Sequence, residues 1–132
     1  MAYAPMVAYE LTPSLVDAGR ALITALDDGN VPVTAAFWLL AEPDGSWRLV
    51  IASPEVDELG PLAFYRKLGS FLRAPAFAEL GSSVVTAVRP GDRKVGRIGS
   101  AIRTGRALES IRLTRNVFNG EFVPDTLIYR VL

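Results

Sequence analysis

Two residue types that carry much of enzyme chemistry are missing from this chain. It has no cysteine and no histidine among its 132 residues. Without cysteine there are no disulfides, thiolate metal sites or thiol nucleophiles. Without histidine there is no imidazole to act as a general base or to bind zinc. Hydrolases built on a histidine base, and zinc sites built on histidine or cysteine, are therefore excluded.

Lysine and long apolar runs are also scarce. Twelve of the fourteen cations are arginine, and only Lys67 and Lys94 are amines. Arginine stays protonated and suits fixed contacts to carboxylate or phosphate, so we expect the cations to bind rather than to transfer protons. The longest apolar run, 33–41, is too short to cross a bilayer, and the first residues do not resemble a signal peptide. We expect a cytoplasmic protein that does not contact a membrane.

The charge of the chain is polarised along its length. Residues 1–62 hold nine acids and two cations, whereas residues 63–132 hold five acids and twelve cations. Eight of these cations lie in the basic stretch 89–115, but the formal net charge of the chain is zero. A dedicated nucleic-acid binder usually keeps an overall basic charge. The balance therefore favours pairing between the two halves, within one subunit or between subunits.

Apolar spacing predicts helices in the first two thirds of the chain. A helix is predicted over 13–28, because Thr12 can cap it and Pro13 suits its first position. Apolar residues three or four positions apart predict a second helix over 61–73, followed by a short helical turn over 76–80.

Strands are predicted where β-branched and aromatic residues gather between turn signals. Runs 31–41 and 47–53 flank Pro43-Asp44-Gly45 and are typical of an antiparallel hairpin. The first of them is apolar on both faces, so we expect it to be a central strand. The segment 53–60 is expected to be a loop, and 83–89 a short strand.

The end of the chain shows a second hairpin signal. Runs 110–118 and 121–131 flank Asn119-Gly120, the residue pair that best fits a two-residue hairpin turn. Pro124 predicts that the last strand begins with an irregularity or lies near an edge. That strand is the expected place for pairing with another copy of the chain.

The basic stretch begins with a predicted helix. Asp92 can cap a helix over 92–104 that Gly105 ends, with Val95, Ile98, Ala101 and Ile102 facing inward. Two internal glycines weaken this prediction, because each costs about 1 kcal/mol relative to alanine. A loop or a broken helix stays open as the alternative.

Together these elements follow the order α-β-β-α-β-(α)-β-β. We therefore predict a single α+β domain over 1–132, with 1–11 as a possible irregular arm. The expected architecture is a two-layer sandwich, in which helices pack on one face of a mostly antiparallel sheet of about five strands.

Three local patterns suggest chemistry that the residues do not complete. Gly91 and Gly96 after a strand have the outline of a phosphate-binding loop, but Arg97-Ile98 replaces the required Lys and Ser or Thr. The acids Glu55, Asp57 and Glu58 are a candidate Mg²⁺ or Ca²⁺ site, but a solvated loop is the favoured explanation. The aromatic residues of the first hairpin could line a pocket, although core packing is the simpler reading of Phe37, Trp38 and Trp47.

The arginine-rich stretch is the candidate contact surface. No aromatic residues alternate with its cations, as a single-strand stacking surface would require, but the cations could follow a phosphate backbone. The candidate residues for contact with an anion or a partner are Arg93, Lys94, Arg97, Arg103, Arg106, Arg112 and Arg115.

These observations lead to one hypothesis and two alternatives. The hypothesis is a non-catalytic protein-interaction domain, without a cofactor, that self-associates or is a subunit of a larger assembly. The first alternative is a nucleic-acid or anion-binding module that uses the basic stretch. The second is a metal-dependent hydrolase or nuclease that uses the three carboxylates.

Overall fold

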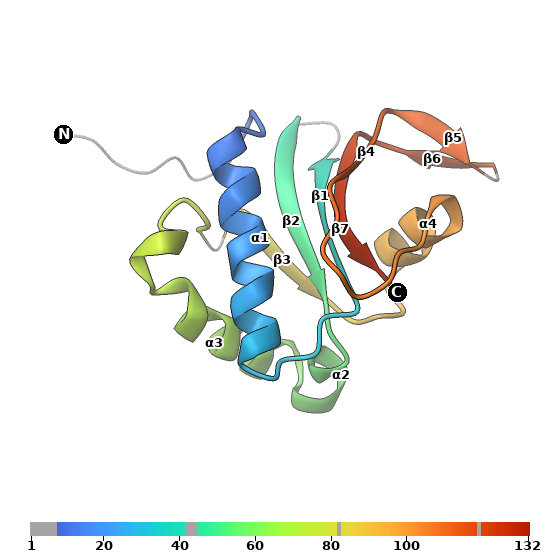
Figure 1. Cartoon of the computed structure of the whole chain (residues 1–132). Helices are drawn as coiled ribbons and strands as arrows, with labels where there is room; N and C mark the ends of the chain where they lie inside the picture. Colours follow the sequence, from blue (N-terminus) through green and yellow to red (C-terminus); the bar gives the residue numbers. More distant parts are fainter. Residues whose placement is uncertain (1–7, 42–44, 82, 119) are drawn as a thin grey trace.

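A five-stranded sheet lies in the middle of the molecule (Figure 1). The computed structural model describes residues 8–41, 45–81, 83–118 and 120–132. The strands of the sheet are β1 (Ala35–Ala41), β2 (Ser46–Ala52), β3 (Val85–Val88), β4 (Ile111–Leu113) and β7 (Thr126–Val131). They lie in the order β3-β2-β1-β7-β4. The β2–β3 pair is parallel and the other neighbouring pairs are antiparallel.

The first helix, α1 (Pro13–Asp28), has the limits that the sequence predicts. The Thr12 hydroxyl oxygen accepts a hydrogen bond from the Leu15 amide at 3.1 Å, which satisfies one of the free donors of the first turn. After the helix, Asn30 adopts a left-handed conformation with φ 61° and turns the chain toward the sheet. The helix buries one apolar stripe against the sheet: Leu15, Leu22, Ile23 and Leu26.

The first hairpin places β1 in the centre of the sheet, as its apolar sequence predicts. β1 pairs with β2 in the register Phe37 opposite Val50. Gly45 has φ 74°, a conformation that favours glycine in a tight turn, whereas Pro43 and Asp44 lie outside the described residues. Residues 1–7 also lie outside them, and Ala8 pairs with Trp47 in an isolated bridge.

The prediction of a loop over 53–60 is wrong, because the helix α2 (Glu55–Leu59) occupies most of this segment. The Ser53 side chain accepts a hydrogen bond from the Glu55 amide at 3.2 Å, and Val56 is buried under the turn. A single helical turn is too short to show an apolar period in the sequence.

Gly60 joins α2 directly to α3 (Pro61–Leu72), which matches the predicted second helix to within one residue. Its φ of 87° is a conformation that side chains rarely adopt, so the chain changes direction there without an intervening loop. The predicted short turn is present as the 3₁₀ helix η1 (Pro75–Phe77).

The fourth helix, α4 (Arg93–Ala101), begins after Asp92, as predicted, but ends three residues before the predicted Thr104. The chain becomes extended at Ile102 (φ −156°, ψ 146°). Thr104 then pairs with the last strand: its amide donates to the Val131 carbonyl at 2.6 Å, and its hydroxyl accepts from the Val131 amide at 2.9 Å. These bonds hold the chain beside β7 and end the helix.

The C-terminal hairpin is present, but each of its predicted strands is divided in two. β5 (Asn116–Phe118) pairs with β6 (Glu121–Val123) as a separate two-stranded ribbon, which leaves the sheet in Figure 1. The breaks lie at 114–115 and at 124–125, where Pro124 was expected to interrupt the strand. Gly120 has φ 77° in the turn, and Asn119 lies outside the described residues.

The last strand is not an edge, contrary to the prediction. β7 lies between β1 and β4 and is buried along its whole length. Its register with β1 shifts between Ala36 and Phe37, so that one extra residue of β7 is accommodated there. The edges of the sheet are β3 and β4.

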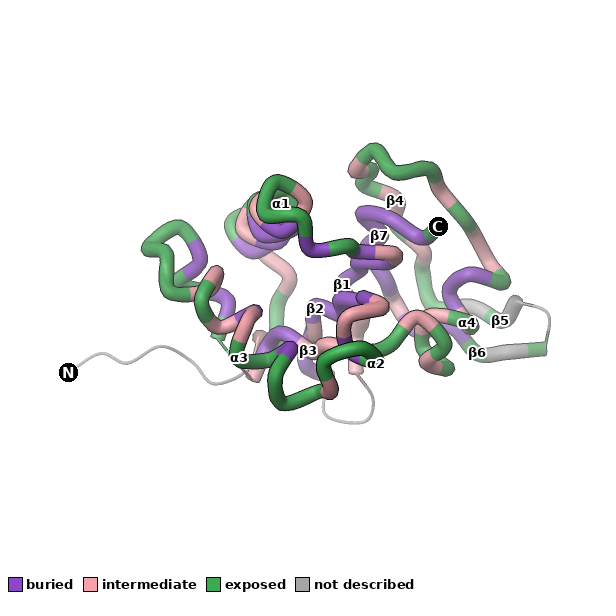
Figure 2. Tube along the Cα trace, turned by 90° about the horizontal axis from the view of Figure 1, so that it is seen from below, coloured by how far each residue is buried: buried purple, intermediate pink, exposed green. Residues whose placement is uncertain are grey.

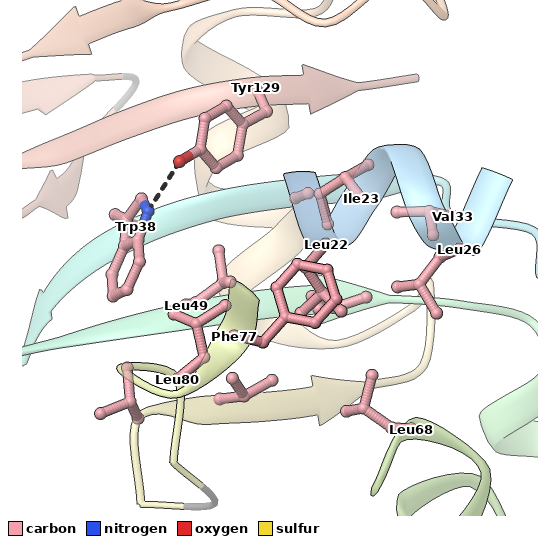
Figure 3. Packing of buried hydrophobic residues seen from close by; sticks show 14 of the residues in the cluster. Leu22, Ile23, Leu26, Val33, Trp38, Leu49, Leu68, Phe77, Leu80 and Tyr129 are labelled. Carbon is pink, nitrogen blue, oxygen red and sulfur yellow. Dashed lines mark hydrogen bonds between the residues drawn. The ribbon is translucent and has the colours of Figure 1, made fainter. Parts of the chain in front are cut away.

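Two apolar cores share the sheet. The larger lies between the sheet and α1, α3 and η1, and Figure 3 shows its packing. The smaller lies on the opposite face, where Ile98 of α4 and Val123 of β6 pack on Phe37 and Ile128. Figure 2 shows α1 and α4 on opposite sides of the buried strands.

The α+β class and the mostly antiparallel five-stranded sheet are confirmed. Helices α1 and α3 cover one face as predicted, and α4 with the ribbon adds a partial cover on the other face. Among the helices of the described residues, none has the length and apolar character needed to span a bilayer.

Candidate functional site

The basic stretch takes two forms in the structure. Its first part is α4, whose apolar side, centred on Ile98, packs against the sheet. Arg93 and Lys94 lie on the exposed side of the first turn, and Arg97 is half-buried. Asp92 stays close to this turn, with its carboxylate 2.8 Å from the Lys94 amide and 3.9 Å from the Lys94 amine. The exposed end of α4 therefore carries two cations and one acid.

The second part of the stretch, from Arg103 onward, runs beside β7. Arg103 Nη1 donates to the Leu132 carbonyl at 2.5 Å, so its guanidinium holds the end of the last strand. The Arg106 carbonyl accepts from Arg130 Nε at 2.7 Å, while the Arg106 side chain is exposed. This part of the stretch therefore both stabilises the last strand and places cations at the surface.

Two of the candidate arginines lie over aromatic rings of their own chain. The guanidinium of Arg112 lies 5.3 Å from the ring centroid of Trp47, and that of Arg115 lies 5.2 Å from the ring of Phe122. The Arg115 amide also donates to the Asp125 carboxylate at 2.6 Å. Both arginine side chains are exposed, as the contact hypothesis requires, but each is held in place by an aromatic neighbour.

Three ion pairs join acids of the first half of the chain to cations of the second half, and none of these cations lies on α4. Arg89, at the start of the basic stretch, lies 3.8 Å from Asp57, and both side chains are more than half exposed. Such a pair contributes little to stability, because water screens it. Glu55 pairs with Lys67 at 2.8 Å, and Asp27 with Arg130 at 2.8 Å.

Arg130 is a buried arginine with a structural role that the sequence did not single out. It is 3% exposed and donates to both carboxylate oxygens of Asp27, at 3.0 and 2.8 Å. It also donates to the Val33 carbonyl at 3.1 Å and to the Arg106 carbonyl. One side chain thus joins α1, the segment before β1, and the basic stretch.

A second buried polar group joins α1 to the sheet. The Tyr129 hydroxyl accepts from Trp38 Nε1 at 2.9 Å, as Figure 3 shows, and donates to the Val16 carbonyl. Arg20 lies over the Tyr129 ring at 5.4 Å and also donates to the Glu109 carbonyl at 2.6 Å. Burial raises the pKa of Tyr129 to about 12, against the opposing effect of the Trp38 hydrogen bond.

The aromatic residues of the first hairpin belong to the two cores. Phe37, Trp38 and Trp47 are buried, and the structure uses them for packing. The simpler of the two sequence-based interpretations is therefore right.

The three acids that formed the candidate metal site all lie on α2. Glu55 is committed to Lys67, and Asp57 lies near Arg89, while Asp57 and Glu58 are exposed. In the part of the chain that the structure describes, no group of three or more acidic side chains converges as a metal site requires.

The ribbon contributes an exposed apolar surface that the sequence did not indicate. Val117 and Phe122 are directly opposite each other in the β5–β6 register and are 59% and 38% exposed. Val123, the next residue, is fully buried in the smaller core. We call Val117, Phe122 and the adjacent Arg115 the ribbon patch. Only the division of the hairpin reveals it, because a continuous strand in the sheet would place these residues differently.

Comparison of the chain with protein-family models, with curated proteins and with solved structures gives no match.

Proposed function

We propose that this chain is a non-catalytic protein-interaction domain that self-associates, and that the ribbon patch is part of its contact face. The observation that carries this proposal is the exposed cross-strand pair Val117–Phe122 on a ribbon outside the main sheet. The proposal also includes the exposed cations of α4, Arg93 and Lys94, which belong to the same basic stretch as Arg115.

The ribbon packs on the rest of the chain through Val123. An isolated two-stranded hairpin is at best marginally stable in water, so it needs packing against another element. Val123 supplies that packing through the smaller core, which also contains Ile98 of α4. Val117 and Phe122 add nothing comparable to this core, because they are exposed. Exposed apolar side chains that gather beside charged ones are typical of protein contact sites.

The charge distribution favours a second copy as the partner. The chain as a whole is neutral, but its first 62 residues are acidic and its remainder is basic. The exposed acids Asp57 and Glu58 of α2 and the exposed cations Arg93, Lys94 and Arg115 give two copies side chains of opposite sign, which can guide the encounter and the orientation of a complex. The absence of histidine and cysteine from the chain leaves few side chains for catalysis, in keeping with a binding role.

Sedimentation velocity over a wide range of protein concentration tests the proposal. We expect the wild-type chain to associate as its concentration rises, and we expect association to weaken when salt screens the charges. The variant Phe122→Ser should associate less, because it removes the largest apolar side chain of the ribbon patch. Tyr9→Ser is the matched control, since Tyr9 is also an exposed aromatic residue but lies far from the ribbon in the sequence. A wild-type chain that stays monomeric at every concentration and salt would overturn the proposal.

A nucleic-acid or anion-binding module is the second candidate, and one observation favours it. Arg93 and Lys94 lie exposed at the start of α4, where helix backbone amides also attract anions. Against it, Arg103, Arg112 and Arg115 are held by groups of their own chain. Fluorescence polarisation with labelled single-stranded and duplex oligonucleotides separates the two candidates, because phosphate contacts give an affinity that falls steeply with salt.

A further inference from the structure

A second exposed apolar surface lies where α2 meets α3. Leu59 and Leu62 flank the Gly60 junction and are 48% and 67% exposed. Tyr65 is 39% exposed and follows Leu62 by three positions, so the two lie on neighbouring parts of the same helix surface. We call Leu59, Leu62 and Tyr65 the leucine patch. Large apolar side chains that gather at an exposed surface are typical of a contact site.

The two apolar patches have neighbours of opposite charge. Asp57 and Glu58, both exposed, directly precede the leucine patch on α2. Arg115 is part of the ribbon patch and lies over its phenylalanine ring. Arg89 lies 3.8 Å from Asp57 and offsets part of the acidic charge, but this solvent-exposed pair is weak. Glu58 remains as an acid beside the two leucines.

The patches lie at separate ends of the molecule. Figure 1 shows α2 below the sheet and the β5–β6 ribbon at the upper right, beyond β4. One copy therefore cannot bring its own ribbon patch to its own leucine patch without unfolding. Contact between the two patches needs two copies of the chain.

The edges of the sheet do not favour a contact between strands. At the β3 edge, the Tyr65 hydroxyl accepts from the Ala87 amide at 2.8 Å and lies 3.4 Å from the Ala87 carbonyl oxygen. That side chain occupies the position that a pairing strand would need. Proteins commonly protect sheet edges in such ways.

The β4 edge is short and carries a charged side chain, Arg112. The Leu40 amide donates to the Asp125 carbonyl, so the backbone groups of Asp125 face β1. Backbone groups alternate along a strand, so those of Leu127 also face β1, and those of Thr126 and Ile128 face β4. The backbone of Arg112, opposite Leu127, consequently points away from the sheet. A three-residue strand with an arginine at its centre is a poor site for pairing with an identical strand, because like charges would lie opposite each other.

We infer that the ribbon patch of one copy docks on the leucine patch of a second copy, head to tail. This inference rests on the proposed self-association and names the surface that receives the ribbon. Apolar side chains meet at its centre, and Arg115 meets the acids of α2 at its border. The two partners use different surfaces, so the first copy can still bind through its leucine patch and the second through its ribbon patch. Such a contact either closes into a ring or continues as a chain of copies.

Complementation between two variants tests this arrangement. Phe122→Ser damages the ribbon patch and keeps the leucine patch, whereas Leu62→Ser does the reverse. Each variant alone should dissociate about tenfold or more readily than the wild-type chain, because an apolar anchor is lost. An equal mixture of the two should form a heterodimer through the one intact pair of patches, and this heterodimer should not grow further. Circular dichroism and thermal unfolding confirm that both variants fold.

The outcomes separate this inference from the proposed function. If Leu62→Ser associates like the wild-type chain and Phe122→Ser does not, the ribbon patch is a contact but its partner surface lies elsewhere, and the head-to-tail arrangement is overturned. The same holds if both variants are monomeric and their mixture also stays monomeric. If neither substitution changes association, both proposals fail. The double variant, which has neither patch intact, is the control for residual association.

Discussion

Arg130 and Asp27 form a two-pronged ion pair between the last strand and the end of the first helix. Two guanidinium nitrogens of Arg130 donate to the two carboxylate oxygens of Asp27, at 3.0 and 2.8 Å. The arginine is almost completely buried, whereas the side chain of Asp27 is 27% exposed. Parallel donors of this kind fix both distance and orientation.

Removal of the aspartate should destabilise the fold strongly. Asp27→Ala leaves a buried cation without its counter-charge, and we expect the free energy of unfolding to fall by about 3 kcal/mol. Urea denaturation measures this loss. Asp28→Ala is the matched control, because Asp28 is the exposed neighbour at the same helix end, and it should change stability by less than about 0.5 kcal/mol. Equal effects of the two substitutions would show that the ion pair contributes nothing.

The stability of the fold should depend on Tyr129 at alkaline pH. The pKa of this tyrosine is raised from 10.0 to about 12 in the folded chain, since burial disfavours the phenolate. The neutral side chain is fully compatible with folding below pH 10. As pH rises from 10 toward 12, the unfolded chain ionises first and folding loses roughly 3 kcal/mol. Urea denaturation at a series of alkaline pH values should show this loss for the wild-type chain. Tyr129→Phe should lack that part of the pH dependence, and a parallel decline in both proteins would contradict the prediction.

Gly19 should not tolerate alanine. A Cβ atom there would lie 2.7 Å from the Tyr129 oxygen and 3.0 Å from Trp38 Nε1. Alanine is normally better than glycine in a helix by about 1 kcal/mol, but here the overlap should outweigh that gain and lower the melting temperature. Gly69→Ala is the opposite control, because that helical glycine has open space around it and should become more stable. Two changes of the same sign would refute the steric argument.

Tyr65 should protect the β3 edge from exchange with solvent. Tyr65→Phe removes the hydroxyl that accepts from the Ala87 amide, so that amide should exchange its hydrogen faster. The Val85 amide, which donates to the Gly81 carbonyl at 3.3 Å, serves as an internal reference. Hydrogen exchange followed by NMR resolves the two amides. An unchanged rate at Ala87 would mean that the tyrosine does not guard this edge.

Local signals predicted the local structure of this chain well. Thr12-Pro13 marked the start of α1, and the glycine of the Pro43-Asp44-Gly45 turn adopts the expected positive φ. Asp92 capped α4 as expected. Each of these signals acts over a few residues, within the reach of one hydrogen bond or one backbone angle.

Features that depend on distant residues could not be predicted. The register shift in β7 brings Arg130 to the face of the sheet that α1 covers, because it moves the alternation of side chains by one position. Nothing near Arg130 in the sequence announces that shift. For the same reason, the sequence did not show that Arg112 and Arg115 would each lie over an aromatic ring.

The sequence indicated the exposed cations of the basic stretch but not the exposed apolar side chains near them. All cations of the basic stretch except the half-buried Arg97 are exposed, as a contact surface requires. The exposed apolar pair of the ribbon was missed, because the sequence shows one long hairpin where the structure has two separate strand pairs, β4 with β7 and β5 with β6. At the division, the Arg115 amide donates to the side chain of Asp125, a residue ten positions away.

The position of β7 has a consequence for how the chain folds. The segments that form α1 to β3 precede it and can build three adjacent strands with their helices by contacts between nearby elements. β4 has no place in that assembly until β7 arrives, because β7 is its neighbour in the sheet. The decisive contacts, such as Trp38 with Tyr129, join residues 91 positions apart. On a ribosome, the β7 and β4 side of the sheet would therefore be the last part to form, and this long-range closure should set the folding rate.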